Sequence, residues 1–270
     1  MTRTHTLLLA IITLCGTSGL SPSAQAETLA ICHDGGPGNT KQASKAVETF
    51  LRHAESVAGL KSDALSGEYH TKAASCDAYI KANTPSIVVL DLATYLRTSK
   101  ASALRPIGHL GAPDSVRWHV VVREGSYSDL SSLSGKTLLS TAPDNAAFIR
   151  NIIFKGQGAD LKVERSRRAL KALRAVGRGQ AEAALVDQDA VKHMGELELP
   201  SPLKSIYSSE GLPALTMAAT EDNATVKKMA GALAKLCDGP GQKLCKTFKV
   251  KRFQPPQPKR LKALEKRYSP

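Results

Sequence analysis

An unbroken apolar run at residues 86–90 (SIVVL) is the feature that most constrains how this chain can fold. Continuous apolarity over the length of a strand is typical of a strand covered on both faces, as in a parallel sheet between helices. Asp91 follows directly, and residues 91–96 (DLATYL) can open a helix. A buried strand that leads straight into a helix predicts an α/β fold.

The same alternation recurs along the chain. Strands are predicted at residues 27–31, 116–123, 135–140, 163–165, 183–186, 203–208 and 214–219. Helical spacing separates them, at residues 40–54, 76–82, 91–96, 145–154, 169–176, 224–237 and 241–248. Residues 214–219 suit a strand that returns to the first half of the chain. The pattern therefore predicts two α/β sheets joined by two crossings.

The first 26 residues have the pattern of a signal peptide. Arg3 precedes an apolar run at 7–14, and Ala24-Gln25-Ala26 supplies the small residues that a signal peptidase accepts. The run is too short to span a bilayer, which argues against a membrane anchor. We expect an exported, periplasmic chain that begins at Glu27.

Four cysteines remain after this cleavage, at positions 32, 76, 237 and 245. An even number in an exported chain points to disulfides. Cys237 and Cys245 flank a turn-rich segment at 238–241, which favours that pair and leaves Cys32 with Cys76. The alternative is a metal site built from Cys32, His33, His70 and Cys76, whose spacing fits no zinc pattern.

Charge gives a further constraint on partners. The chain has 37 Lys and Arg against 24 Asp and Glu, a net charge of +13, or +12 without Arg3. Nucleic acid is not an expected partner, because the chain is expected to be exported, only 4% of residues are aromatic, and the basic residues are spread along the chain apart from one cluster near the C-terminus. One basic cluster, at 259–267, lies on a short helical pattern, either as a solvated helix or against a membrane surface.

Catalytic motifs are missing from the sequence. It has no Gly-x-Ser-x-Gly elbow and no zinc-protease helix, and Lys136-Thr137 lacks the upstream glycine of a P-loop, since Leu130 stands there. We therefore expect a protein without catalytic residues, metal or cofactor.

Three segments together resemble one family. Residues 85–96 (PSIVVLDLATYL), 133–137 (LSGKT) and 176–187 (VGRGQAEAALVD) are similar, in order and spacing, to the phosphate- and phosphonate-type substrate-binding proteins of ABC importers. The resemblance implies the type 2 periplasmic binding protein fold: two lobes, each a mixed sheet flanked by helices, with two hinge crossings. Residues 27–115 and 216–270 would form lobe 1, and 116–215 lobe 2. It also implies a monomer that works with the membrane subunits of an importer.

In such a fold the ligand lies between the lobes, at helix starts beyond the carboxyl ends of parallel strands. The ligand contacts expected there are Asp34, Gly35, Asp91, Thr94, Tyr95, Ser140, Thr141, Asn145 and Asp187. Ordinary structural roles stay open for several of them: a helix cap for Asp91 or Thr94, a core position for Tyr95 and a turn for Asp187.

The sequence departs from the family where an oxyanion would bind. Relatives follow the Gly-Lys strand with a proline and a Ser-Thr-Ser type run, whereas here Pro143 precedes Asp144-Asn145-Ala146-Ala147. The hydroxyls are gone, and Asp144 would oppose an anion at the helix start. We expect a small polar or anionic ligand, such as a phosphate, phosphonate or other oxyanion. The alternative is an interaction or sensory protein without a transport role.

Overall fold

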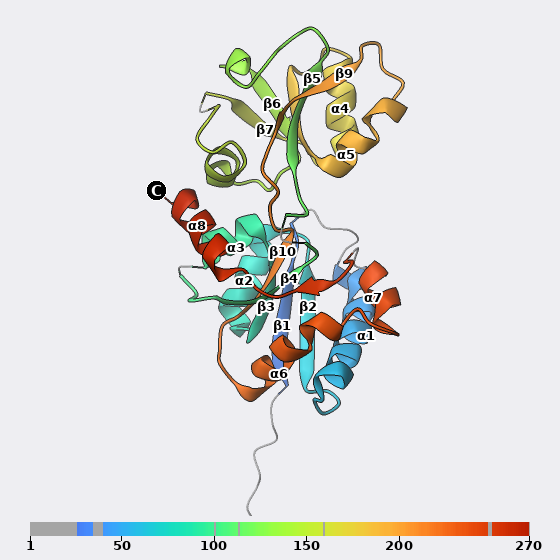
Figure 1. Ribbon diagram of the computed structural model, residues 1–270, viewed down its shortest axis with the longest axis vertical. Coiled ribbons are helices and arrows are strands. Elements are labelled where there is room, and N and C mark those ends of the chain that lie inside the picture. The colour runs from blue at the N-terminus through green and yellow to red at the C-terminus, as the bar shows by residue number, and fades with distance from the viewer. Residues whose placement is uncertain are drawn as a thin grey trace, which may run out of the picture.

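The computed structural model describes residues 26–34, 40–99, 101–112, 114–158, 160–247 and 250–269. Gly35 and the predicted signal peptide before Ala26 lie outside the described residues. The described chain forms two α/β lobes, one above the other in Figure 1, each with its own sheet. The expectation of a two-lobe α/β fold with mixed sheets is confirmed.

The first sheet has six strands in the order β11-β4-β10-β3-β1-β2. Strands β1, β2 and β3 are parallel, while β10 lies antiparallel between β3 and β4, and β11 pairs antiparallel with β4. Their bounds are β1 Glu27–Cys32, β2 Leu65–His70, β3 Ile87–Asp91, β4 Arg105–Leu110, β10 Leu215–Ala219 and β11 Phe253–Gln254. The return of the late strand β10 into this sheet is the return that the sequence predicts.

The second sheet has five strands in the order β7-β6-β8-β5-β9. Strands β7, β6 and β8 are parallel, and β5 runs antiparallel to both β8 and β9. Their bounds are β5 Trp118–Arg123, β6 Thr137–Ser140, β7 Lys162–Arg165, β8 Ala183–Asp187 and β9 Leu203–Ser208. The chain passes between the sheets after β4 and again after β9. An isolated antiparallel bridge between Val116 and Leu212 holds these two crossings side by side.

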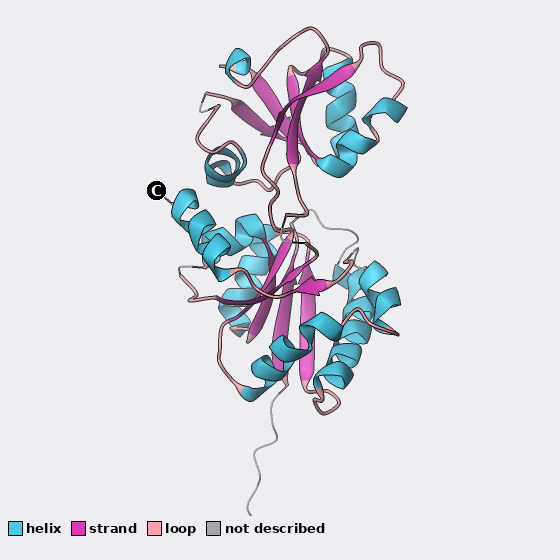
Figure 2. Ribbon diagram, in the orientation of Figure 1, coloured by secondary structure: helices cyan, strands magenta, loops and turns pink. Residues whose placement is uncertain are grey.

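Helices cover both sheets, as Figure 2 shows. In the first lobe they are α1 Thr40–Ala58, α2 Ala73–Asn83, α3 Leu92–Thr98, α6 Ala224–Ala232, α7 Gly241–Thr247 and α8 Pro258–Tyr268. In the second they are the π-helix η2 Phe148–Ile153, α4 Ala169–Gly177 and α5 Gln188–Lys192. Short 3-10 turns lie at η1 Ser131–Leu133, η3 Met194–Glu196 and η4 Leu233–Lys235.

Strand alternation divides the core into layers. In β1, Leu29 and Ile31 pack toward α1, while Ala30 and Cys32 face the opposite side of the sheet. Helix α1 meets the first of these layers with an apolar face of Val47, Phe50, Leu51 and Ala54, all of them buried. This helical spacing is the amphipathic pattern of a helix packed on a sheet.

The C-terminal helix α8 of the first lobe also contacts the second lobe. Figure 1 shows it in red beside α3, at the level where the two lobes meet. It packs on α3 of the first lobe and on η2 of the second. Leu261 and Leu264 are buried in a hydrophobic cluster that includes residues of both lobes. The lobes are therefore joined by a third element in addition to the two crossings.

The first lobe contains two disulfides. Cys32 at the end of β1 is bonded to Cys76 in α2, and Cys237 is bonded to Cys245 in α7. These are the pairs that the sequence favours. Of the helices in the described ranges, none is both long and apolar enough to cross a membrane.

Candidate functional site

The carboxyl ends of the parallel strands of both sheets approach each other. Asp34 follows β1 and Asp91 ends β3 in the first lobe, while Arg165 ends β7 and Asp187 ends β8 in the second. Nη2 of Arg165 donates to Oδ2 of Asp34 at 3.0 Å. A direct bond between residues at these two edges means that the edges face one another. This is the region where open α/β folds bind ligands.

Within the described part of the chain, Asp34 and Arg165 form the only ion pair that joins a strand end of the first sheet to a strand end of the second. The Asp34 side chain is 12% exposed and that of Arg165 is 36% exposed. Asp144 lies on the other side of the guanidinium, with 4.0 Å between its Oδ2 and Nη1 of Arg165. A strand is expected at 163–165 from the sequence, but Arg165 is not among the residues expected to contact a ligand. Its position at a strand end is the signal that would have found it.

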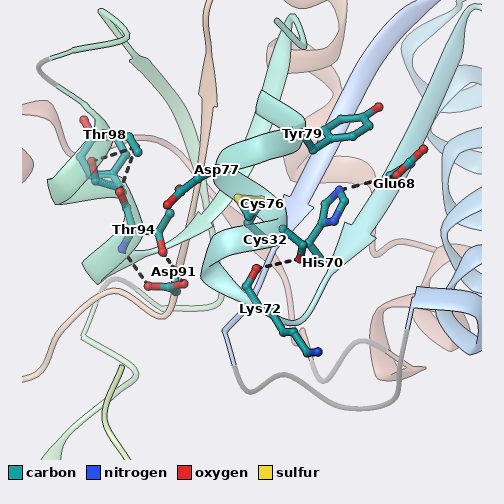
Figure 3. Close-up of a disulfide and its surroundings, with 12 residues drawn as sticks. Cys32, Glu68, His70, Lys72, Cys76, Asp77, Tyr79, Asp91, Thr94 and Thr98 are labelled. Atoms are coloured by element: carbon teal, nitrogen blue, oxygen red, sulfur yellow. Dashed lines mark hydrogen bonds and ion pairs between the residues drawn. A yellow bond between two sulfur atoms is a disulfide. The ribbon is translucent and has the colours of Figure 1, made fainter. Parts of the chain in front are cut away.

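Asp91 and Thr94 lie close together at the start of α3 (Figure 3). The Asp91 carboxylate accepts from the Thr94 backbone N–H and from the Thr94 hydroxyl, both at 2.9 Å. Both residues are buried. Asp91 is thus the N-cap of α3, and its carboxylate is already hydrogen-bonded inside the first lobe.

Tyr95 points toward the C-terminal helix. It is 1% exposed, and its hydroxyl donates to Glu265 of α8 at 3.1 Å. Burial raises the pKa of the Tyr95 hydroxyl well above its usual range, and the Glu265 carboxylate raises it further. The group is therefore a neutral donor that ties α3 to α8.

Ser140 and Thr141 stand at the end of β6. The Ser140 hydroxyl is fully buried and accepts from the Ala142 N–H at 3.1 Å. The backbone N–H and the hydroxyl of Thr141 both donate to the Leu185 carbonyl, at 2.9 and 3.2 Å. The two Thr141 bonds fix the end of β6 to β8, whereas the Ser140 hydroxyl is used in the turn that follows β6.

Asn145 connects the second lobe to α8. Its Oδ1 accepts from the Phe148 N–H at 3.0 Å, while its Nδ2 donates to the Tyr268 hydroxyl at 3.0 Å. Asn151 donates to the Tyr268 carbonyl at 3.0 Å. The amide that was expected to bind a ligand oxygen is therefore used by the C-terminal helix. Tyr268 was not selected from the sequence, where nothing marks it.

Asp187 caps α5 and accepts from the Ala190 N–H at 2.9 Å. It is partly exposed, and β5 pairs with it through Trp118. Nearby, burial lowers the pKa of the His119 imidazole and the Arg117 charge lowers it further, whereas the Asp187 charge partly opposes both effects. Asp187 therefore keeps some solvent access at this edge of the second lobe, as the more exposed Asp144 does.

The structure argues against a metal site built from Cys32, His33, His70 and Cys76. The sulfur atoms of Cys32 and Cys76 are bonded to each other, so neither can act as a thiolate. Figure 3 shows His70 on the far side of this disulfide from Asp91. His70 stacks on Tyr79, with 4.9 Å between ring centroids, and lies 3.7 Å from the Glu68 carboxylate.

Two hollows of the first lobe lie away from the strand ends of the second. A small apolar cavity of about 50 Å³ lies between the first sheet and α1, lined by residues such as Leu29, Phe50 and Phe253. A surface hollow of about 470 Å³ lies between α2 and α3, beside Asp77, Lys81 and Arg97. Neither contains any of the expected ligand contacts.

The arrangement can bind but offers little for catalysis. Three helix starts at the facing edges are filled by their own caps, Asp91, Asn145 and Asp187. Arg165 is the cation at the edge, between two carboxylates. Such a site recognises a ligand by exchanging these polar contacts for contacts to the ligand.

Comparison with known families gives one match. The family described as the periplasmic substrate-binding protein of phosphonate ABC transporters matches residues 45–261. No curated protein matches the sequence.

Solved structures show the same fold. A Xanthomonas citri protein bound to ATP is 13% identical, with a TM-score of 0.69 over 90% of this chain and 97% of that one. PhnD1 of Prochlorococcus marinus, in complex with methylphosphonate, is 10% identical, with a TM-score of 0.65 over 90% and 97%. A binding protein component of an ABC phosphonate transporter from Pseudomonas aeruginosa is 12% identical, with a TM-score of 0.61 over 90% and 88%.

Proposed function

Because this chain belongs to the periplasmic substrate-binding proteins of phosphonate-type ABC transporters, we propose that it captures a small polar or anionic solute between its lobes and delivers it to the membrane subunits of an importer. The family binds its substrates and is not a family of enzymes. Export through cleavage before Glu27, and lobes at 27–115 with 216–270 and at 116–215, are part of this proposal.

The observation that carries the proposal is the Asp34–Arg165 pair between the facing strand ends. Arg165 has a planar guanidinium that suits phosphonate, phosphate or carboxylate oxygens. An anionic ligand would take the place of Asp34 at this guanidinium. The caps at Asp91, Asn145 and Asp187 would stay with their helices and shape the walls of the site.

Isothermal titration with methylphosphonate, inorganic phosphate and a panel of amino acids tests this function, together with X-ray scattering for compaction on binding. We expect one ligand class to give heat and a smaller radius of gyration. Arg165→Gln should weaken binding of an anionic ligand by about tenfold to a hundredfold, the range of a charge-assisted hydrogen bond.

Arg97→Gln is the matched control. Arg97 is also 36% exposed and bonded to an aspartate, Asp77, but it lies on α3 away from the facing edges. Its substitution should leave the affinity unchanged. Asp34→Asn distinguishes an anionic ligand from a cationic one. It should raise the affinity for an anion, because it removes the carboxylate that competes for Arg165, and it should lower the affinity for an amine. No heat with any solute, and no compaction, would contradict capture.

The use of Asn145 by Tyr268 supports a second function, docking of another periplasmic protein by a fold without a solute. The absence of hydroxyls at 144–147 agrees with it. This function predicts a silent titration panel, together with a defined, salt-sensitive protein partner whose binding survives Arg165→Gln.

A further inference from the structure

Basic side chains gather at one place in the second lobe. Residues 162–178 contain seven Lys and Arg and one acidic residue, Glu164, which gives a net +6 of the +13 of the whole chain. This segment comprises β7, the connection that leads to α4, and α4 itself. The expectation that basic residues are spread along the chain, apart from one cluster near the C-terminus, is wrong for this segment.

The helix presents these charges on one side. Lys171, Arg174 and Arg178 follow one another at intervals of three and four residues, so they lie on one face of α4. Arg167 and Arg168 precede its first turn. All five are exposed, whereas Ala172, Leu173 and Val176 on the opposite face are buried against the second sheet. We call the five cations and Leu170 the α4 basic face.

No side chain of the described residues neutralises these five cations. None of them forms an ion pair, and none donates a side-chain hydrogen bond, within the described part of the chain. Arg165 differs from them, since it is bonded to Asp34. The charge of the face is thus available to an external partner.

The positive charges at the start of α4 are unfavourable for the helix itself. Its first turn has no acidic residue and its N-cap, Arg168, makes no side-chain cap hydrogen bond. By contrast, Asp91 and Asp187 cap α3 and α5. Cations at a helix N-terminus oppose the helix dipole, so Arg167, Arg168 and Lys171 do not stabilise this helix.

An apolar side chain lies among the cations. Leu170 is 41% exposed, and it is one of two large hydrophobic residues of the described chain with this exposure. The other is Val163 of β7, in the same basic segment. A cationic helix face with an exposed leucine is the composition of interfacial helices that lie on anionic lipid.

We propose that the α4 basic face docks on a bilayer surface that contains anionic phospholipid headgroups. A row of separate cations on a convex helix suits a dense, laterally mobile layer of phosphates, which needs no shaped pocket on the protein. Docking would hold the protein at the membrane where the transporters of its family work. The proposal does not depend on which solute the lobes capture.

Co-sedimentation with vesicles tests it. The full chain without its predicted signal peptide is mixed with vesicles of phosphatidylcholine, or with vesicles in which phosphatidylglycerol replaces a third of this lipid. We expect binding to the second kind only, and loss of binding at high salt. The triple variant Arg167→Gln, Lys171→Gln, Arg174→Gln should have a partition coefficient about a hundredfold lower.

The control removes the same number of charges elsewhere. Lys259, Lys262 and Lys266 are exposed on α8 and also form no ion pair in the described structure. Their triple substitution to Gln should change the partition coefficient by less than about threefold. Equal losses in the two variants would overturn the proposal in favour of diffuse attraction by net charge. Absence of wild-type binding at low salt would also overturn it, and would favour an acidic protein as the partner of this face.

Circular dichroism and thermal unfolding accompany both variants. The six substituted side chains are exposed, so both variants should fold as the wild type does. The variant Leu170→Ser gives a second, independent readout, because it keeps every charge. It should weaken vesicle binding by about tenfold through loss of apolar contact alone, and unchanged binding would contradict contact between Leu170 and the bilayer.

Discussion

Nδ2 of Asn145, at the start of η2, donates to the hydroxyl of Tyr268 at the end of α8, with 3.0 Å between the two atoms. Around this bond, Glu210 in the second crossing accepts from Arg267 of α8 and pairs with Lys155 at 3.1 Å. Burial would raise the pKa of Glu210, but the bonds from Arg267 and Lys155 outweigh it and lower the pKa overall. The C-terminal helix therefore braces the second lobe and the hinge together.

Tyr268→Phe should loosen this brace. It removes one hydroxyl that bonds Asn145, so the free energy of unfolding should fall by about 1 kcal/mol. The radius of gyration without ligand should rise slightly, because the lobes are less restrained. Urea unfolding and X-ray scattering measure the two effects.

Tyr79→Phe is the control for loss of a tyrosine hydroxyl. Tyr79 stacks on His70 in the first lobe, and its hydroxyl makes no hydrogen bond among the described contacts. Its substitution should leave both quantities unchanged. Equal effects in the two variants would show that the Asn145–Tyr268 bond does not restrain the lobes.

The two disulfides should differ in their contribution to stability. Cys32–Cys76 closes a separation of 44 residues, and Cys237–Cys245 closes one of 8. Loop closure entropy predicts losses of about 4 and about 2.5 kcal/mol when each pair is replaced by alanine. Urea unfolding of the two double variants measures these losses. A larger loss for the Cys237–Cys245 pair would contradict the entropic account.

The sequence predicts strands well where apolar runs are unbroken, and poorly where a glycine stands in the strand. Residues 86–90 anticipated β3, but β2 and β4 were missed. A Cβ at Gly67 in β2 would lie 2.9 Å from the Leu29 carbonyl oxygen, and one at Gly108 in β4 would lie 2.6 Å from Leu233 Cδ1. These glycines allow close packing, yet in a sequence they resemble strand breakers.

In the candidate site, too, some contacts could be predicted from the sequence and others could not. The cap of α3 by Asp91 involves residues three apart, so a local pattern could suggest it. The bonds Asp34–Arg165 and Asn145–Tyr268 join residues 131 and 123 positions apart. No local pattern specifies such contacts, because they follow from how the two lobes and α8 pack. The basic face of α4 was missed for another reason, since its helical periodicity was read only for the apolar side.

His109 should make the stability of the protein fall in mild acid. It is 1% exposed in β4, where its Nε2 accepts from the Gln257 N–H at 3.3 Å and its Nδ1 lies 3.4 Å from the Thr216 hydroxyl. Burial lowers the pKa of His109 from its ordinary 6.5, and the Arg260 charge of α8 lowers it further.

As the pH falls through 6.5, the unfolded chain takes up a proton at His109, whereas the folded protein does so only at a lower pH. Acid therefore favours the unfolded state, by at most about 1.4 kcal/mol per pH unit. His109→Gln should make this decline shallower in thermal unfolding on either side of pH 6.5. His193→Gln, at an exposed histidine of the second lobe, is the control for replacement of a histidine, and an equal change of the decline in both variants would contradict the role of burial at His109.

Asp91 tests whether a residue at the facing edges acts as a helix cap or as a ligand contact. Its carboxylate bonds the N–H and the hydroxyl of Thr94, and it is 7% exposed. Asp91→Ala should lower the free energy of unfolding by about 1 to 2 kcal/mol, the cost of a lost cap, whereas Asp91→Asn keeps an acceptor and should lose less. If Asp91 acts only as a cap, Asp91→Asn should keep full affinity for any solute found by titration. A large loss of affinity in this variant at unchanged stability would instead make the carboxylate a ligand contact, which requires it to leave Thr94 when the lobes close.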